Sequence, residues 1–242
     1  MKKTGRQENY GDITNTIGDQ LSFEATEAYK RLRTNLLFSF AGEDKCRVVG
    51  VTSSLRDEGK STTSANLSYS LAEMGKRVLL IDADMRRPNV SKLLDLQPSP
   101  GLSNLLVGAD DGVKLIQAAG IQKNLHVMTA GDIPPNPTEL LSSKRMEGTI
   151  KLLSERYDFI IIDLPPVGAV ADALIVSKYM DGVVVVVRDS YVDKRTLDKT
   201  INQLRYHEVR IVGFVLNGAK SEGKYYRKRY EKKGAKYGYG PQ

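Results

Sequence analysis

The chain has 242 residues, of which 40% are hydrophobic and 27% charged, a composition typical of a folded protein with a substantial core. It contains no apolar run long enough to span a bilayer, and its first residues lack the apolar segment of a signal peptide. A single cysteine excludes an internal disulfide, and one Cys with two His gives no basis for a transition-metal site. Any bound metal should therefore be a hard cation on oxygen ligands.

The net charge of +7 is concentrated at the end of the chain. Residues 220–242 hold eight Lys and Arg and two Glu, a net charge of +6, so the remaining body is close to neutral. The overall charge is therefore no argument for a nucleic-acid partner.

The N-terminal part divides into an arm and a helix. Residues 1–22 are polar and aperiodic, and we expect a loosely held arm there. From Phe23 the pattern turns helical, with one apolar side formed by Ala28, Leu32, Leu36, Leu37 and Phe40. Glu27, Lys30 and Arg33 recur every three residues and share one stripe. These charges could pair within the helix or contact a neighbouring subunit, and the sequence leaves both open.

A phosphate-binding loop is indicated by the next segment. The apolar run Val48–Thr52 predicts a buried strand, and a polar loop ending in Gly59-Lys60-Ser61-Thr62 leads into a helical pattern. In such a P-loop, backbone N–H groups surround the phosphates, Lys60 contacts the β- and γ-oxygens, and the Ser61 hydroxyl binds Mg²⁺. Ser54 stands where the full pattern has Gly. Acidic motifs at two later strand ends support the same interpretation.

Those two strands end in carboxylates. The run Val78–Ile81 leads into the D-x-D-x-R motif of residues 82–86, and the run Phe159–Ile162 ends at Asp163, which is the Walker B pattern. Open α/β sheets bind their ligands at the carboxyl ends of the strands. We therefore expect these acidic side chains to lie beside the P-loop.

The remaining chain alternates strands with helices. We expect strands near 125–129, 182–188 and 209–216, and helices over 146–156, 169–179 and 193–206. Short helices and loops fill 91–131. The loop 130–143 contains three prolines and is either a connector or part of a substrate groove. The alternation predicts an α/β fold with a doubly wound, mostly parallel sheet.

The basic tail holds five of the twelve tyrosines, namely Tyr225, Tyr226, Tyr230, Tyr237 and Tyr239. It has no aliphatic residue larger than Ala, so it cannot build a core and we expect it to be mobile. Three hypotheses fit this composition: stacking on single-stranded nucleic acid, binding to an anionic membrane surface, and phosphorylation of the exposed tyrosines.

Together these features resemble the bacterial tyrosine kinases (BY-kinases) of capsule and exopolysaccharide systems, in the split form whose cytoplasmic kinase is separate from its membrane-spanning activator. The resemblance extends over 23–242 and rests on the Glu27 helix, the P-loop, the D-x-D-x-R motif, the proline loop, Asp163 and the tyrosine tail. It implies a P-loop kinase domain of the MinD/ParA-like type over 23–219, between an arm over 1–22 and a tail over 220–242. It also implies protein-tyrosine kinase activity with ATP and Mg²⁺.

The resemblance further implies roles for individual residues. Catalysis would involve Lys60, Asp82, Asp84 and Arg86, with Asp82 favoured as the base and Asp84 organising metal and water. The nucleotide would be bound by Asp57, Glu58, Gly59, Lys60, Ser61, Thr62 and Asn217. Asn217 would read adenine, and Arg188 is a second candidate for that role. The ligands of Mg²⁺ would be Ser61, Asp82, Asp84 and Asp163. The phosphate acceptors would be the five tail tyrosines.

The resemblance also implies partners. The chain would form a ring-shaped homo-oligomer in which Glu27, Lys30 and Arg33 pack on the next subunit and each tail is phosphorylated by a neighbour. Lys30 replaces the first Arg of the family's E-x-x-R-x-x-R pattern and lacks its bidentate fork. An activator would recruit the cytoplasmic kinase to the inner face of the cell membrane. Other protein substrates and a cognate tyrosine phosphatase are expected, and no specific nucleic acid.

Two other functions remain open. A MinD/ParA-type positioning ATPase would share the sheet and the acidic motifs but would have no protein substrate. Such proteins carry a second lysine early in the P-loop, where this chain has Leu55, and do not usually end in clustered tyrosines. A nucleic-acid-binding protein using the basic tail would show steeply salt-dependent binding, and the near-neutral body argues against it.

Overall fold

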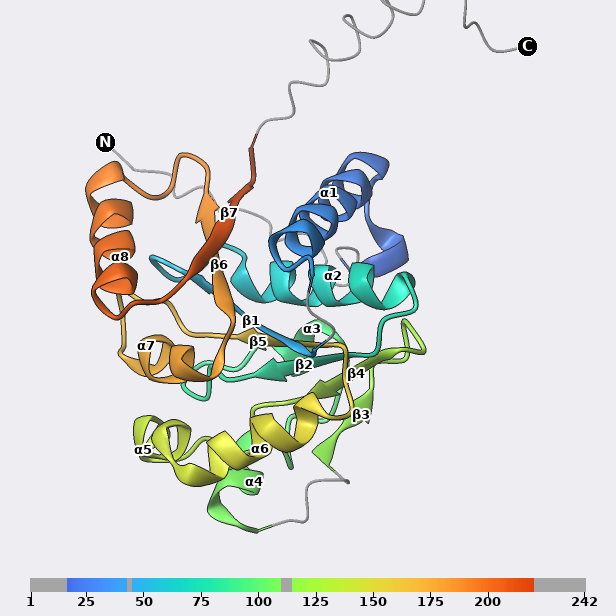
Figure 1. Cartoon of the computed structure of the whole chain (residues 1–242), viewed down its shortest axis with the longest axis vertical. Helices are drawn as coiled ribbons and strands as arrows, with labels where there is room; N and C mark the ends of the chain where they lie inside the picture. The colour runs from blue at the N-terminus through green and yellow to red at the C-terminus, as the bar shows by residue number, and fades with distance from the viewer. Residues whose placement is uncertain (1–16, 43–44, 110–114, 220–242) are drawn as a thin grey trace, which may run out of the picture.

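The computed structural model describes residues 17–42, 45–109 and 115–219 (Figure 1). The tyrosine tail and residues 1–16 of the expected arm lie outside the described residues. Within the described ranges, no helix is both long and apolar enough to cross a membrane.

A seven-stranded sheet forms the centre of the domain, in the order β3-β4-β2-β5-β1-β6-β7. The strands are β1 (Arg47–Ser53), β2 (Val78–Asp82), β3 (Gln117–Ala118), β4 (Leu125–Met128), β5 (Phe159–Asp163), β6 (Gly182–Arg188) and β7 (Ile211–Asn217). Every neighbouring pair is parallel except β3 with β4. The predicted doubly wound, mostly parallel sheet is therefore confirmed.

Helices cover both faces of this sheet. They are α1 (Phe23–Ser39), α2 (Lys60–Glu73), α3 (Val90–Leu93), α4 (Leu102–Val107), α5 (Pro137–Ser142), α6 (Lys144–Ser154), α7 (Asp172–Val176) and α8 (Lys194–Tyr206), with short 3₁₀ turns η2 (Gly18–Gln20) and η4 (Ser177–Tyr179). Residues of α1, α2 and α3 pack in one hydrophobic core, and residues of α4 to α8 pack in the other. Figure 1 shows α1 and α2 on one side of the sheet and α4, α5 and α6 on the opposite side.

The register of the central strands brings the three predicted motifs to one edge of the sheet. β5 lies between β1 and β2, and Asp163 is paired with Val51 on one side and with Asp82 on the other. All residues of β1, β2 and β5 are buried, because helices cover both faces. The P-loop and the two acidic motifs therefore leave the sheet side by side.

Three local expectations differ from the structure. Residues 17–22 pack against the domain instead of forming a loose arm: Ile17 is buried, and the Gly18 N–H donates to Asn66 Oδ1 at 3.0 Å. Ala28 is exposed, whereas Leu36 and Phe40 are buried in the core that residues of α2 also form. The helix expected over 169–179 is shorter, with α7 followed by the 3₁₀ turn η4.

Candidate active site

The P-loop joins β1 to α2 through a turn that requires glycine. Gly59 is the N-terminal capping residue of α2 and has φ of 88°, and a Cβ atom built on it would lie 2.1 Å from Asn217 Nδ2. Ser54, at the position of the pattern's first Gly, is not among the residues with positive φ, so glycine is not required there. The first N–H groups of α2 have no intrahelical acceptor and form an anion site at the loop.

The buried carboxylate of Glu58 holds the loop in shape from within. Its Oε1 accepts the Leu55 N–H at 2.6 Å, and its Oε2 accepts the Arg188 N–H at 3.1 Å. Asn217 Nδ2 donates to the Glu58 carbonyl at 2.9 Å, and Arg188 Nη1 donates to the Asp57 carbonyl at 3.1 Å. Glu58, Asn217 and Arg188 therefore connect the P-loop to the ends of β6 and β7.

Lys60 is the cation shared by the acidic motifs. Its Nζ lies 3.0 Å from Asp84 Oδ2 and 3.4 Å from Asp163 Oδ2. Burial alone would lower the pKa of Lys60, but the charges of Asp163 and Asp84 outweigh it and raise the pKa above its usual value. Asp163 also accepts a hydrogen bond from Ser64 Oγ at 3.0 Å. The lysine remains charged and available to an anionic ligand.

Asp82 lies deeper than Asp84. One of its oxygens accepts the Asp84 N–H, and the other accepts the N–H groups of Asn89 and Val90, each at 3.1 Å. Asp82 is fully buried, and its burial and the nearby charge of Asp163 raise its pKa. Burial also raises the pKa of Asp163. Asp82 and Asp163 therefore bind a proton more tightly than a solvent-exposed Asp side chain does.

A pocket of about 440 Å³ opens above these residues. Its lining includes predicted site residues, namely Asp57, Gly59, Lys60, Ser61, Thr62, Asp84, Arg86 and Arg188, but neither Asp82 nor Asp163. No cluster of three or more acidic, His or Cys side chains in the described part of the chain is arranged to hold a metal alone. The hydroxyl and carboxylate oxygens here suit Mg²⁺, which commonly combines one or two carboxylates with substrate phosphates. The donor set therefore fits Mg²⁺ together with a nucleotide.

Two residues of this site, Thr138 and Asp172, were not predicted from the sequence, and both contact the predicted residue Arg86. Arg86 Nε donates to Asp172 Oδ2 at 2.7 Å, and Arg86 Nη2 donates to Thr138 Oγ1 at 3.0 Å. Thr138 in turn donates to Asp172 Oδ1 at 2.7 Å. The signals for Asp172 and Thr138 were weak: an Asp opening a short apolar helix, and a Thr after the prolines of the 130–143 loop.

The stripe on α1 is split in the structure. Lys30 Nζ lies 3.0 Å from Glu27 Oε1, so these two residues pair within the helix. Arg33 turns toward α2, where its Nη1 donates to the Ser70 carbonyl at 2.7 Å and lies 3.2 Å from Glu73 Oε2. A contact of these residues with another subunit stays a prediction, and so do the acceptor tyrosines, which lie outside the described residues.

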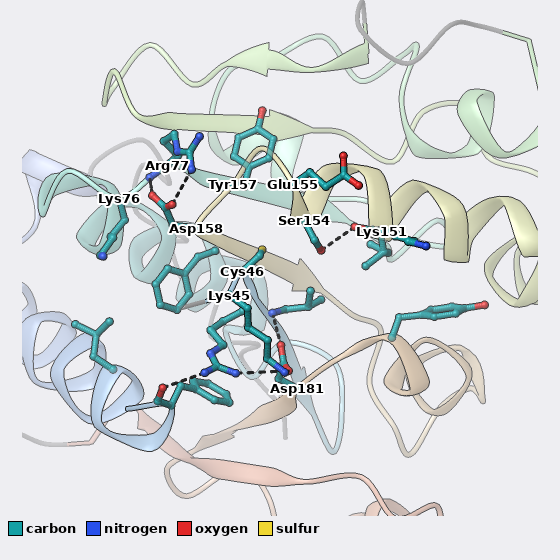
Figure 2. Close-up of a pocket in the computed structure, with 17 residues that line it drawn as sticks. Lys45, Cys46, Lys76, Arg77, Lys151, Ser154, Glu155, Tyr157, Asp158 and Asp181 are labelled. Atoms are coloured by element: carbon teal, nitrogen blue, oxygen red, sulfur yellow. Dashed lines mark hydrogen bonds and ion pairs between the residues drawn. The ribbon is translucent and has the colours of Figure 1, made fainter. Parts of the chain in front are cut away.

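A second pocket lies at the opposite edge of the sheet, with a volume of about 870 Å³ (Figure 2). It is lined by the starts of β1 and β5 and by the end of α6, and none of the predicted site residues lines it. Figure 2 shows Arg77 beside Asp158 and Lys45 beside Asp181, so these four charges form local pairs.

The sequence is similar to known proteins over most of its length. The family model described as an AAA domain matches residues 56–210. The tyrosine-protein kinase YwqD of Bacillus subtilis is 40% identical over 81% of this chain and 81% of its own length. The putative tyrosine-protein kinase CapB of Staphylococcus aureus is 33% identical over 83% of this chain and 87% of its own length. The tyrosine-protein kinase etk of Escherichia coli is 34% identical over 83% of this chain, which spans only 27% of that longer protein.

Solved structures with the same fold lead to the same family. The chimerical protein CapA2B2 has a TM-score of 0.76 and 34% identity, and covers 81% of this chain and 85% of its own. The kinase domain of the Escherichia coli tyrosine kinase ETK has a TM-score of 0.75 and 33% identity, over 81% and 78% of the two chains. MinD of Pyrococcus horikoshii, complexed with Mg-ADP, scores lower at 0.61 with 26% identity, over 73% and 72%. The chain shares the P-loop ATPase-like fold with MinD, and it belongs to the family of bacterial protein-tyrosine kinases.

Proposed function

We propose that the protein transfers the γ-phosphoryl group of Mg²⁺-bound ATP to tyrosines of its own C-terminal tail, acting between subunits. The observation that carries this proposal is the grouping of Lys60 with Asp84 and Asp163 at the mouth of the P-loop. A charged lysine beside oxygen ligands for a cation is the arrangement that phosphoryl transfer requires.

The chemical step is a displacement at phosphorus. The phenol oxygen of a tyrosine attacks the γ-phosphorus, the bond between that phosphorus and the β,γ-bridging oxygen breaks, and ADP leaves. Mg²⁺, when bound, neutralises phosphate charge, and Ser61, Asp84 and Asp163 are the residues best suited to hold it. Lys60 stabilises the charge that develops on the transferred group.

The phenolic proton passes to a carboxylate, and Asp82 remains our candidate for this base. Its raised pKa suits a proton acceptor near neutral pH. However, its oxygens are occupied by backbone N–H groups, whereas Asp84 lines the pocket. Asp84 is therefore the alternative base. The two roles are separated by the pH dependence of transfer in Asp82→Asn and Asp84→Asn, because replacement of the base removes the acidic limb of the profile.

We assign the backbone N–H groups of the P-loop, including those of Asp57, Gly59 and Thr62, to binding the nucleotide phosphates. Asn217 is the candidate adenine reader, with Arg188 second. Their hydrogen bonds to the P-loop support positions next to the nucleotide. Glu58 supports the nucleotide site indirectly, since its carboxylate is turned into the loop.

The proposal includes partners. Ring assembly through the α1 stripe would bring one subunit's tail to the next subunit's pocket. Glu27 and Lys30 are partly exposed and suit such a contact better than Arg33, which is bound to α2.

A membrane-spanning activator would recruit the kinase from the cytoplasm to the inner face of the membrane. The similarity to CapA2B2, and to tyrosine kinases over most of their length, supports this split organisation. The activity would regulate capsule or exopolysaccharide synthesis and export, with other substrates and a tyrosine phosphatase completing the cycle.

The central experiment uses γ-labelled ATP, Mg²⁺ and the purified full chain, followed by mass spectrometry of phosphopeptides. Changing the tail residues Tyr225, Tyr226, Tyr230, Tyr237 and Tyr239 to Phe should remove most of the label. The matched control is Tyr206→Phe on α8, a tyrosine that is 85% exposed and lies in the folded domain. Labelling of tyrosine that is unchanged in the five-Phe variant would refute the tail as acceptor.

A mixing experiment tests transfer between subunits. Lys60→Met chains lack activity but keep the tail, whereas five-Phe chains keep activity but lack acceptors. When the two are mixed, label should accumulate on the Lys60→Met chains. ATP hydrolysis without any phosphotyrosine in the parent chain would favour the MinD/ParA-type ATPase instead.

A further inference from the structure

Three separate segments meet at Arg86 in a closed triangle of hydrogen bonds. Arg86 follows β2, Thr138 is the second residue of α5, and Asp172 begins α7. All three sides of the triangle are short: Arg86 to Asp172 at 2.7 Å, Arg86 to Thr138 at 3.0 Å, and Thr138 to Asp172 at 2.7 Å. The loop after β2, the proline loop and the segment before α7 are therefore fixed to one another.

The charge at the centre of this triangle is buried. The Asp172 side chain is 2% exposed, and its ion pair is with Arg86. An ionised carboxylate at this depth is costly unless it is paired and hydrogen-bonded. Arg86 binds both of its oxygens, through Nε at 2.7 Å and Nη2 at 3.3 Å, so the guanidinium plane is fixed in orientation.

The other side of Arg86 faces the active-site pocket. Its side chain is 40% exposed and lines this pocket, two residues after Asp84. Nη1 makes no hydrogen bond with any part of the chain that the structure describes. It is available to a ligand in this pocket.

The segment before Asp172, the partner of Arg86, adds apolar side chains to the pocket. Pro165, Pro166, Ala169 and Val170 line the same pocket, immediately before α7. A tyrosine ring can pack on such a surface, and its hydroxyl or the phosphate it attacks can accept a hydrogen bond from Arg86. These apolar side chains differ in kind from the P-loop residues of the same pocket, which present backbone N–H groups and Lys60.

We propose that Arg86, fixed by the positioning residues Thr138 and Asp172, forms the subsite for the acceptor tyrosine, with the segment 165–170 as its apolar side. The inference rests on the proposed function, since it assigns one wall of the same pocket to the protein substrate. Thr138 and Asp172 act through Arg86, and through it they affect acceptor binding more than nucleotide binding.

The test compares Thr138→Val with Thr138→Ser, using a synthetic tyrosine-containing peptide of the tail sequence as acceptor. Valine has nearly the shape of threonine but cannot complete the triangle, whereas serine keeps the hydroxyl. We expect Thr138→Val to raise the KM for the peptide about tenfold, the size of one lost hydrogen bond to a charged group. The KM for ATP should change less than about twofold. Thr138→Ser should restore the KM for the peptide.

Two further variants make the result decisive. Arg86→Lys keeps the charge pair with Asp172 but loses the planar fork, so it should show the same rise in peptide KM with a normal melting temperature. The control is Thr196→Val, because Thr196 Oγ1 donates to Asp193 Oδ2 at 3.0 Å in the same Thr–Asp arrangement at the start of α8, away from the pocket. It should change neither KM.

The outcomes separate this inference from the proposed function. If the parent chain phosphorylates no tyrosine peptide, the proposed function fails. If the parent is active but Thr138→Val and Arg86→Lys leave the peptide KM unchanged, or raise both KM values equally, the acceptor subsite is refuted while the kinase remains. A failure of Thr138→Ser to restore the KM would also refute it.

Discussion

The two pockets at opposite edges of the sheet differ in how their carboxylates are satisfied. At the P-loop edge, Asp84 and Asp163 share the single cation of Lys60. At the other edge, two carboxylates each have a close cation: Asp158 pairs with Arg77 at 2.9 Å, and Asp181 lies 3.3 Å from Lys45. In the first arrangement two carboxylates share one cation, whereas in the second each of these two carboxylates has a cation of its own.

The pKa shifts follow the same contrast. Burial and neighbouring negative charge raise the pKa of Asp82, and burial raises that of Asp163. The pKa of Asp158 is instead held below its ordinary value: its partial burial is outweighed by hydrogen bonds from the Arg77 side chain and N–H. The thiol of Cys46 in that pocket has its pKa raised to about 11 by burial, so it is not a reactive thiolate.

Pocket size therefore does not identify the site. The pocket of about 870 Å³ is the larger, yet two of its carboxylates, Asp158 and Asp181, already have a cation each. The pocket of about 440 Å³ is the smaller, and its lining includes Lys60, the cation that Asp84 and Asp163 share. Buried carboxylates with raised pKa values that share one cation are typical of functional sites.

The largest expected effect comes from removing the shared cation. Lys60→Met should lower tyrosine phosphorylation by about a thousandfold, because the charge on the transferred group loses its closest protein cation. The measurement is the initial rate of label incorporation, with circular dichroism to check that the fold is retained. A folded variant with more than about a tenth of the parent rate would contradict the role of Lys60.

A smaller effect should follow from disturbing the P-loop from within. In Glu58→Gln, one oxygen that accepts an N–H is replaced by an NH₂ group that cannot accept, which leaves either Leu55 or Arg188 with an unpaired, partly buried N–H. We expect nucleotide affinity to fall about tenfold, from the order of 1–3 kcal/mol that such a group costs. Calorimetric titration with Mg-ADP measures it, and unchanged affinity would show that the loop keeps its shape without this carboxylate.

The stability of the ligand-free protein should depend on pH at the P-loop edge. The pKa of Asp82 is raised from 3.8 to about 7, so the folded protein binds this proton more tightly than the unfolded chain does. The favourable contribution of the bound proton is therefore present below the ordinary pKa and is lost as pH rises toward about 7. Melting temperatures measured from pH 4 to pH 8 test this, and Asp82→Asn should flatten the slope. An equal slope in the variant would assign the dependence to other groups.

The smallest functional effect is expected at the opposite edge. Asp181 Oδ2 accepts the Val48 N–H at 2.8 Å. Because a hydrogen bond to a charged acceptor is stronger than one to a neutral acceptor, Asp181→Asn should lower the free energy of unfolding by about 1–2 kcal/mol. The initial rate of kinase activity should stay at the parent value. A loss of activity in this variant, with the fold retained, would show that the larger pocket is coupled to the active site.

The arrangement of the sheet and of the charged motifs could be predicted from the sequence. Continuous apolar runs such as Val183–Val187 and Ile160–Ile162 are typical of strands that helices cover on both faces. Their secondary structure can therefore be predicted from local composition. In a parallel sheet the carboxyl ends of such strands meet at one edge. Lys60, Asp84 and Asp163 were therefore expected together before any contact was known.

The tertiary structure alone decided which way the polar side chains point. Glu58 turns into the P-loop, Arg33 turns toward α2, and Asp82 is enclosed by backbone N–H groups while Asp84 reaches the pocket. The triangle of Arg86, Thr138 and Asp172 joins residues up to 86 positions apart in the sequence. Side-chain direction depends on which distant partner can satisfy a buried charge, and no local pattern contains that information.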